Sequence, residues 1–357
     1  MRVLQLIDSL ETGGAERAAV NIANSLAEEI DTSFLCATRN EGLLKESLST
    51  RVKFLFLNKK RTLDFKPIIR LNRYVKQQHI DVIHAHSTSF FLATIIKLLN
   101  KEVKIIWHDH YGNSEYLHKR KFWILKFCSK YFDHVFSVNS NLVYWAKNHL
   151  KTRSISYLAN FAVKNKVKSI TQLFGKEGKR IVHLANLRSQ KDHHTLISAF
   201  AKVVKKHPEY TLHCVGKDLN DDYSSSVKKQ IIDLGLNNHV FLYGSKPDVS
   251  YILSQCSIGV LSSKSEGLPI ALLEYGLTGL PVIVTNVGDC KDVILSNDYG
   301  LLIKPSDKNL LEKSILFYID NQSKAKVIGQ KLKTRIEKYF STRAISRTLI
   351  LTYKKIL

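Results

Sequence analysis

Residues 260–287 have the sequence VLSSKSEGLPIALLEYGLTGLPVIVTNV, and this stretch decides the fold. It begins at the end of an apolar run that predicts a buried strand, and the apolar residues 282–284 predict another. Pro269 suits the first position of a helix, where its missing N–H costs nothing, and Gly276 and Gly279 are expected to end that helix. The order strand, loop, helix, strand indicates a parallel α/β unit.

The junction between the loop and the helix suits a phosphate, because the first backbone N–H groups of a helix lack partners within it. Glu266 lies just ahead of this helix, and Glu274 lies inside it. Carboxylates accept paired hydrogen bonds from neighbouring hydroxyls, so two of them around a phosphate site suit a nucleotide sugar. A helix with an acidic first turn, stabilised by its dipole, would also account for Glu266. It would not account for Glu274, which stands among apolar residues where a carboxylate needs a partner.

The same stretch resembles the donor-site signature of the retaining glycosyltransferases of family 4. The residues that carry the resemblance are Glu266-Gly267-Leu268-Pro269, Glu274, Gly279-Leu280-Pro281-Val282 and Gly288. The resemblance implies a GT-B fold, in which two Rossmann-like, doubly wound parallel-sheet domains face each other across a cleft and a C-terminal helix crosses back to the first domain. It also implies that Glu274 holds the ribose hydroxyls and Glu266 the donor sugar. The remaining donor-site residues that it implies here are Gly267, Leu268, Pro269 and Ile270.

A glycine pair, Gly13 and Gly14, lies between the first predicted strand, at residues 3–7, and an amphipathic helix. Glycines at such a junction let the backbone approach a ligand closely. The pair lacks the full dinucleotide-binding fingerprint, so it is a weak signal by itself. Family 4 members have a similar Gly-Gly-Ala-Glu facing the cleft, and the resemblance therefore implies that Gly13 and Gly14 contribute to the donor site.

Predicted strands and helices alternate through both halves of the chain, which indicates the α/β class with two doubly wound parallel sheets. The segment between the halves contains charges and glycines and has little periodicity. We therefore predict an N-terminal acceptor-binding domain, a linker, a C-terminal nucleotide-sugar-binding domain and a crossover helix, at residues 1–162, 163–179, 180–340 and 341–357 respectively.

Histidines stand at two predicted strand ends of the first half, in the sequences IHAH at 83–86 and WHDH at 107–110. Ligands of parallel sheets bind outside these ends. Imidazoles together with Asp109 could ligate zinc, although no helical pair of histidines is present here and the family uses no metal. The alternative is that several of these histidines, His84 and His86 above all, are satisfied core residues. The resemblance implies one histidine beside the donor sugar, and His110 fits that position, with His108 as the alternative.

Arg188 and Lys191 follow the first predicted strand of the second half. The fork of an arginine and the point charge of a lysine can neutralise a diphosphate, so no metal or other cofactor is expected. Many family members have an arginine where this chain has Asn186, which leaves open the phosphate oxygen that Arg188 would reach. An exposed basic turn is the alternative. Together with Glu266 and His110, these two cations are the expected catalytic residues.

The net charge of +23, from 54 Lys and Arg against 31 Asp and Glu, implies attraction to a polyanion. Nucleic acid and an anionic membrane are the candidates, but we find no nucleic-acid-binding motif or basic arm. Residues 116–132 mix cations with large apolar side chains, which suits a helix lying on anionic lipid. A solvated cationic face over an ordinary core helix would give the same pattern. The start of the chain does not resemble a signal peptide. No run approaches the ~20 apolar residues of a membrane span. Five scattered cysteines indicate a reducing compartment.

These observations and the resemblance predict a metal-independent retaining glycosyltransferase. It would move a sugar from a UDP- or GDP-sugar to a glycan or lipid-linked acceptor, in cell-envelope or exopolysaccharide biosynthesis. We expect a cytoplasmic protein that lies peripherally on the inner face of the cell membrane and binds no nucleic acid. The alternatives are a sugar-nucleotide epimerase of the same fold and, in a different class, a basic nucleic-acid-binding protein. The sugar, the acceptor and the linkage stay open at this point.

Overall fold

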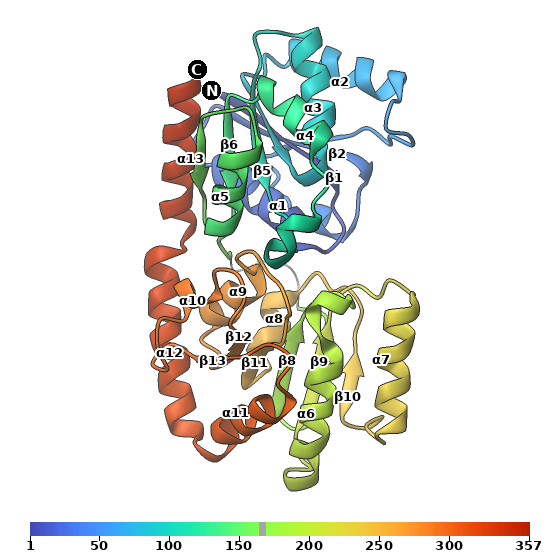
Figure 1. Ribbon diagram of the computed structural model, residues 1–357, viewed down its shortest axis with the longest axis vertical. Coiled ribbons are helices and arrows are strands. Elements are labelled where there is room, and N and C mark those ends of the chain that lie inside the picture. The colour runs from blue at the N-terminus through green and yellow to red at the C-terminus, as the bar shows by residue number, and fades with distance from the viewer. Residues whose placement is uncertain (164–168) are drawn as a thin grey trace. The chain divides into compact units, whose positions relative to one another are not determined.

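The computed structural model of the chain describes residues 1–163 and 169–357, with the backbone alone at residue 115, and it divides into two units. The first unit combines Met1–Phe161 with Thr342–Leu357, and the second is Ala162–Ser341. Each unit is built around its own parallel sheet, as the alternation of strands and helices predicted (Figure 1).

The sheet of the first unit has seven parallel strands in the order β3-β2-β1-β4-β5-β6-β7. The strands are β1 (Arg2–Ser9), β2 (Thr32–Asn40), β3 (Lys53–Phe56), β4 (Val82–His86), β5 (Lys104–Asp109), β6 (His134–Ser137) and β7 (Ile155–Tyr157). The helices are α1 (Gly14–Leu26), α2 (Phe65–Gln77), α3 (Phe90–Leu99), α4 (Trp123–Cys128), α5 (Ser140–His149) and α13 (Thr342–Ile356), with short 3-10 turns at Leu43–Ser47, Ser87–Ser89, Ser114–Lys119 and Ser129–Tyr131.

The direction of each crossover decides which face of this sheet a helix covers. The chain moves one way across the sheet through α1 and the opposite way through α2, α3, α4 and α5, so right-handed crossovers place α1 on one face and the other four on the second. α13 joins α1 on the first face, where it buries Leu349 and Tyr353, and its Ser346 hydroxyl contacts that of Ser25. The predicted C-terminal helix thus packs on the first unit.

The second unit has six parallel strands in the order β10-β9-β8-β11-β12-β13. Its strands are β8 (Arg180–Leu184), β9 (Thr211–Val215), β10 (Val240–Leu242), β11 (Ile258–Leu261), β12 (Val282–Thr285) and β13 (Leu301–Ile303). Its helices are α6 (His193–Lys206), α7 (Asp222–Asp233), α8 (Val249–Ser254), α9 (Ile270–Thr278), α10 (Cys290–Val293), α11 (Lys308–Asp320) and α12 (Gln322–Tyr339), with a 3-10 turn at Ser189–Lys191.

In both sheets the strand order reverses beside the first strand, at β1/β4 and at β8/β11. The loops that leave these two strands diverge to opposite faces, and the crevice between them is where doubly wound sheets bind ligands. The topology therefore indicates one candidate ligand-binding edge in each unit.

The helix of the opening stretch differs in detail from its prediction. α9 begins at Ile270, and Pro269 is its N-cap, with the extended backbone of φ −72° and ψ 122°. Gly279 ends the helix in the left-handed region at φ 85°, as predicted, whereas Gly276 lies inside it. A Cβ at Gly276 would stand 2.6 Å from the Ile336 side chain, so this glycine lets α12 pack closely on α9 instead of ending the helix.

The last part of the predicted linker is held by the second unit. Residues 164–168 lie outside the described residues, but the end of the segment is hydrogen-bonded into the second unit. The Asp248 carboxylate accepts from the backbone of Ile170 and from both the backbone and the hydroxyl of Thr171, and the Gln255 side chain accepts from Leu173. Polar anchors far along the chain hold this segment, and no local periodicity reveals them.

All five cysteines are free, and four of them are buried. None of the helices in the described part of the chain combines the length and the apolarity that crossing a bilayer requires.

Candidate functional site

A buried ion pair marks the point in the second unit where the strand order reverses. Lys191 follows β8, Glu266 follows β11, and the Lys191 ammonium lies 2.5 Å from the Glu266 carboxylate. Glu266 is 5% exposed, and it also accepts a 2.6 Å hydrogen bond from the Ser263 hydroxyl. Two residues that the sequence predicted separately are therefore in direct contact.

The loop after β8 is held in place from both sides. Asp192 adopts a left-handed backbone at φ 51° and caps α6, where its carboxylate accepts from the backbone and the hydroxyl of Thr195. The Ser262 hydroxyl donates to the Lys191 carbonyl, and the Lys264 backbone donates to the Gln190 carbonyl. These bonds join the loops after β8 and β11, so the position of Lys191 is fixed by backbone contacts as well as by Glu266.

Gly288 explains why the loop after β12 can lie against the same place. Its φ is 54°, and a Cβ there would stand 2.3 Å from the Gly267 carbonyl oxygen and 2.4 Å from that of Glu266. Only glycine fits both the dihedral angle and this contact. The backbone of Asp289 then donates to the Gly267 carbonyl, which fixes the turn ahead of α9.

The start of α9 carries the other predicted donor-site residues. Leu268 and Ile270 are 2% and 6% exposed, so their side chains anchor the turn and leave the backbone to meet a ligand. Glu274 lies one turn further along α9 and is half-buried, less enclosed than its apolar neighbours in the sequence suggested. The structure thus places Gly267, Pro269 and Ile270 at a helix N-terminus, which is a favourable place for an anion.

Arg188 differs from Lys191 in having an exposed side chain in the same loop. Asn186, which stands where many family members have an arginine, accepts a hydrogen bond from the Lys217 backbone. The neighbouring Gly216 packs so closely that a Cβ would stand 2.1 Å from the Ala185 carbonyl oxygen. Asn186 therefore joins the loops after β8 and β9. The cations of the loop after β8, Arg188 and Lys191, follow Asn186 in the sequence.

In the first unit, Gly13 and Gly14 begin α1 at the carboxyl end of β1. A Cβ at Gly13 would meet the Glu16 carboxylate at 2.2 Å, whereas nothing in the described structure lies within 4 Å of a Cβ at Gly14. The helix N-terminus is thus open beside Gly14, and a ligand can approach the backbone there.

Four histidines gather on the α1 and α13 face of the same sheet, because residues two apart in a strand share a face. His84 and His86 lie at the end of β4, His108 lies near the end of β5, and His110 directly follows β5. The ring centroids of His86 and His110 are 5.2 Å apart, and those of His108 and His110 are 4.0 Å apart. His84, His86 and His108 are fully buried, while His110 is half-buried at the end of its strand.

Burial lowers the pKa of all four imidazoles, and repulsion between neighbouring rings adds to this effect for His84, His86 and His108. Desolvation brings the pKa of His110 down to about 3. At neutral pH each ring is therefore uncharged, with one N–H to donate and one lone pair to accept.

Asp109 does not join the histidines. The Arg120 guanidinium binds its carboxylate through two hydrogen bonds of 2.7 and 2.8 Å, and it also lies over the rings of Tyr111 and Trp145. The zinc set of imidazoles with Asp109 is therefore not assembled. One ring nitrogen from each of His84, His86 and His108 lies within 4.8 Å of the others, a spacing that a metal could use, but hydrogen bonds between the rings account for the same arrangement.

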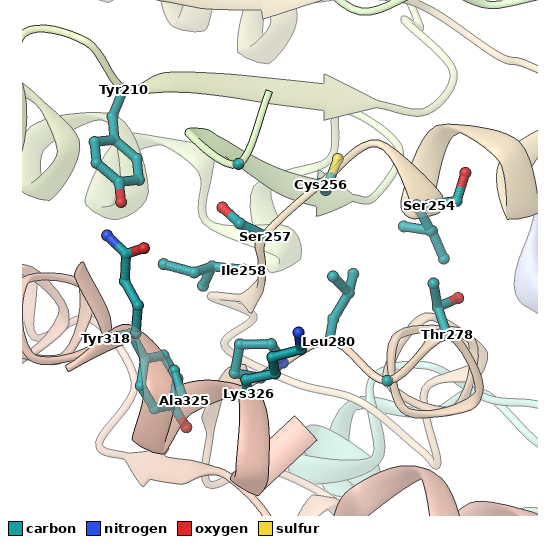
Figure 2. A pocket seen from close by; sticks show the side chains of 15 residues that line it. Tyr210, Ser254, Cys256, Ser257, Ile258, Thr278, Leu280, Tyr318, Ala325 and Lys326 are labelled. Atoms are coloured by element: carbon teal, nitrogen blue, oxygen red, sulfur yellow. The ribbon is translucent and has the colours of Figure 1, made fainter. Parts of the chain in front are cut away.

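A pocket of about 520 Å³ in the second unit lies away from these residues (Figure 2). Its lining includes Tyr210, Ser257 and Pro281, which precede β9, β11 and β12. These residues mark the amino ends of the strands, opposite to the edge that carries Lys191 and Glu266. Cys256, which is labelled in Figure 2, also lines it, and burial raises the pKa of its thiol to about 12.

Sequence reasoning missed the polar residues that support the site. Ser263 donates directly to Glu266, and Asp192 holds the loop that carries Lys191 through contacts with Thr195 and Lys264. A serine in a polar loop and an aspartate after a lysine carry no distinctive pattern. Gly288 was noted within the resemblance, although the contact that requires it is with Glu266 and Gly267, in an earlier loop of the chain. Gln5, which bonds to His86, is polar within an apolar strand, and that contrast was a usable signal.

Two protein-family descriptions match the chain. Glycosyltransferase Family 4 matches residues 12–160, and Glycosyl transferases group 1 matches residues 166–335.

The similar proteins cover nearly the whole chain. An uncharacterized glycosyltransferase of Haemophilus influenzae is 25% identical over 341 residues, which cover 92% of each chain. The GalNAc-alpha-(1->4)-GalNAc-alpha-(1->3)-diNAcBac-PP-undecaprenol alpha-1,4-N-acetyl-D-galactosaminyltransferase of Campylobacter jejuni is 24% identical over 349 residues, covering 95% of this chain and 94% of that protein. The crystal structure of Anabaena Alr3699/HepE in complex with UDP and glucose matches with a TM-score of 0.81 and 17% identity, covering 99% of this chain and 100% of that one.

Proposed function

Because the chain belongs to the family 4 type of glycosyltransferases with the GT-B fold, we propose that it transfers a sugar from a nucleoside-diphosphate sugar, UDP- or GDP-linked, to a glycan or lipid-linked acceptor. The observation that carries this proposal is the contact between Lys191 and Glu266 where the strand order of the second unit reverses, beside the N-terminus of α9.

The chemistry of this edge suits a nucleoside-diphosphate sugar. The N-terminus of α9, Lys191 and the exposed Arg188 offer positive charge to a diphosphate, and they would stabilise it as it leaves. Glu266 would accept hydrogen bonds from the sugar hydroxyls, and the half-buried Glu274 from the ribose hydroxyls. In the first unit, the open backbone at Gly14 and the half-buried ring of His110 would serve the same reaction. Exposure favours His110 over His108 for this role, because His108 is fully buried.

Two finer features complete the proposal. The transfer would retain the configuration of the sugar, as the family resemblance implies. It would need no metal, since the cations of the loop after β8 would neutralise the leaving group.

The relatives favour a lipid-linked acceptor in polysaccharide biosynthesis. The Campylobacter jejuni relative is named for an undecaprenol-linked acceptor, and an O-antigen biosynthesis glycosyltransferase of Escherichia coli is 24% identical to this chain over 343 residues. A lipid-linked acceptor lies at a membrane, so we place this enzyme on the cytoplasmic face of one.

The outer helices of the first unit support this placement. α4 exposes Trp123, Ile124 and Phe127, with Lys121 and Lys130 beside them. α2, in the same helix layer, exposes Phe65 and Ile69, which alternate with exposed arginines and lysines. Large apolar side chains among cations are the pattern of a surface that rests on anionic lipid.

The proposal is tested by incubating the protein with UDP- and GDP-sugars, with and without a lipid-linked oligosaccharide, and following both substrates by mass spectrometry. Transfer predicts that the acceptor gains one sugar and the nucleoside diphosphate is released. A donor that isomerises without any acceptor would indicate the epimerase alternative. Tight, salt-dependent binding to duplex DNA, with no donor consumed, would indicate the nucleic-acid-binding alternative.

A further inference from the structure

The four imidazoles of the first unit form two hydrogen-bonded chains, and one of them leads from the buried side chain of Gln5 to His110. Gln5 lies in the middle of β1 with no exposed surface. Its carbonyl oxygen lies 2.8 Å from Nε2 of His86, and Nδ1 of His86 lies 3.0 Å from Nε2 of His110. The mechanism proposed above uses only the last of these three residues.

The positions of the protons in this chain follow from the one group that can only accept. The amide oxygen of Gln5 has no proton, so Nε2 of His86 must carry one and donate it. His86 is neutral in its buried position, with Asp109 bound to Arg120, so its Nδ1 is a bare lone pair. That lone pair can only accept, and Nε2 of His110 must therefore carry the proton that it donates to His86.

We infer that Gln5 acts through His86 as a positioning residue, which holds His110 as the Nε2–H tautomer and leaves Nδ1 of His110 as a lone pair for a substrate hydroxyl. No residue in the described part of the chain hydrogen-bonds this Nδ1, and the ring is only half-buried. A neutral acceptor at this position suits a sugar hydroxyl, which donates. It does not suit a phosphate oxygen, which also accepts. The inference rests on the proposed role of His110 in sugar transfer.

The second chain provides an internal comparison. The hydroxyl of Tyr353 lies 2.6 Å from Nδ1 of His84, and Nε2 of His84 lies 3.2 Å from Nδ1 of His108. This chain begins on α13 and contains neither His86 nor His110, although the Tyr353 hydroxyl also interacts with the Gln5 side chain. Removal of this hydroxyl leaves the hydrogen bond between the Gln5 carbonyl oxygen and His86 in place, so the tautomer of His110 should be unchanged.

The tautomer can be measured directly in protein labelled with ¹⁵N-histidine, because long-range ¹H–¹⁵N spectra distinguish a protonated ring nitrogen from a bare one. His110→Gln identifies the signals of His110. In the wild type we expect Nε2 of His110 to be protonated and Nδ1 bare. In Gln5→Leu, and in His86→Phe as a second variant, both nitrogens should show averaged signals. Tyr353→Phe should give the wild-type pattern for His110, and thermal melting followed by circular dichroism confirms that each variant is folded.

Kinetics then tests whether the position of the proton matters. Loss of one neutral hydrogen bond to the substrate should lower kcat/KM about three- to tenfold in Gln5→Leu. Gln5→Leu should cause no further loss when it is combined with His110→Ala, because both act on one interaction.

Three results would overturn the inference: a His110 protonated at Nδ1 in the wild type, an unchanged His110 tautomer in folded Gln5→Leu, or one equivalent of metal bound to the imidazoles. If His110→Ala kept full activity while the tautomer changed as expected, the positioning by Gln5 would stand and the role of His110 in transfer would fall.

Discussion

At the scale of single residues, Lys191 and Glu266 depend on each other. The Glu266 carboxylate is almost fully buried, and the Lys191 ammonium lies 2.5 Å from it. An ion pair in such a position contributes little net stability, but removal of one partner leaves a buried charge uncompensated. The pair is therefore best explained by function, since it keeps both groups charged at the edge where a donor would bind.

This dependence predicts a strong coupling between the two side chains. Lys191→Met alone should lower the unfolding free energy of the second unit by about 3 kcal/mol, because Glu266 stays buried without its partner. Lys191→Met with Glu266→Gln should recover most of that loss, since no buried charge remains. Urea denaturation of the two single variants and the double variant gives the coupling energy. Strictly additive effects would mean that the pair does not interact as described.

Replacement of Glu274 by alanine should weaken binding of the donor without unfolding the protein. It is half-buried on α9, and removal of a charged hydrogen bond costs about 1.5–3 kcal/mol. The dissociation constant of Glu274→Ala for the nucleoside diphosphate should therefore rise at least tenfold, as measured by calorimetry. Glu312→Ala is the matched control, because Glu312 is a carboxylate of the same unit that pairs with Lys202 and Lys206 on α6. Equal affinities for the wild type and Glu274→Ala would remove Glu274 from the donor site.

The charged residues of the site could be predicted from the sequence, and their supports could not. Glu266, Glu274 and Lys191 stand at distinctive spacings next to strand ends. Asp192 and Gln5 act through contacts with distant segments, which no local pattern encodes, and Ser263 is one of several serines in its loop, with nothing in the sequence to distinguish it. The side-chain contact between Lys191 and Glu266 was equally invisible, because it joins residues 75 positions apart.

At the scale of elements, the segment 116–132 shows where helix prediction failed. A helix lying on anionic lipid was expected within this segment, but the structure has a 3-10 turn, the six-residue α4 and a second short turn. Arg120 is the physical reason, since its guanidinium is bound to Asp109 and enclosed by aromatic rings, which fixes the chain ahead of Trp123. Arg120 is therefore structural, which corrects its inclusion among the cations expected to face lipid.

The exposed face of α4 leads us to expect binding to anionic vesicles. This binding should have an electrostatic part, from the lysines, and an apolar part, from the aromatic side chains. Each lysine near an anionic surface contributes about 1 kcal/mol, so Lys121, Lys126 and Lys130 changed together to Ser should weaken binding strongly at low salt. Trp123→Ser with Phe127→Ser should weaken the part of the binding that persists at high salt, because screening does not affect apolar contact. Sedimentation with vesicles that contain or lack anionic lipid measures both effects.

Three exposed lysines of the second unit, Lys205, Lys313 and Lys324, changed together to Ser form the control, since they remove the same charge elsewhere. Binding that responds equally to both triple variants would show that the net charge acts without a defined surface. Binding that ignores lipid charge altogether would remove the membrane from the proposal.

Because several strands carry buried histidines, we expect the stability of the folded chain to fall in acid. Burial lowers the pKa of His134, His183 and His213 to about 4, and that of His84, His86 and His108 well below 6.5. The unfolded chain binds protons at these rings below about pH 6.5, and the folded chain does not until a much lower pH. Stability should thus be full above pH 6.5 and fall as the pH decreases toward 4, by about 1.4 kcal/mol per pH unit for each histidine.

Urea denaturation between pH 7.5 and pH 4.5 measures this slope. His134→Gln should reduce it by one histidine's contribution in the first unit, because His134 is buried against Ser154 and Ser156. His118→Gln is the control, since the side chain of His118 is exposed. A stability that does not change across this range would mean that the buried rings are already charged in the folded state.

At the scale of the whole molecule, the order of strands and helices was predictable because the inner strands of both sheets are buried and form mostly apolar runs. The elements that the sequence did not reveal are α10, β13 and α12. α10 and β13 are very short, and α12 has a mostly polar sequence whose buried side chains pack on α9. The hydrogen bonds of residues 170–173 to Asp248 and Gln255 were hidden for the same reason as the site supports, since their partners lie far along the chain.

The charge of +23 fits this organisation without a nucleic-acid partner. Some cations are committed to structure, such as Arg120, and others to the proposed donor site, such as Lys191 and Arg188. The exposed cations of α2, and Lys121 and Lys130 on either side of α4, stand beside exposed apolar side chains, which is the arrangement that lipid favours over nucleic acid.

Transfer of a sugar from a nucleoside-diphosphate donor is the central claim, and one measurement tests it most directly. The full-length protein is incubated with its preferred UDP- or GDP-sugar and a lipid-linked acceptor in the presence of EDTA. The mass of the acceptor is then measured by mass spectrometry. The account predicts that the acceptor gains the mass of one sugar, that chelation does not stop the reaction, and that folded Lys191→Met with Glu266→Gln loses it. An acceptor whose mass never changes with any nucleotide sugar, with or without added Mg²⁺ or Mn²⁺, would contradict the claim.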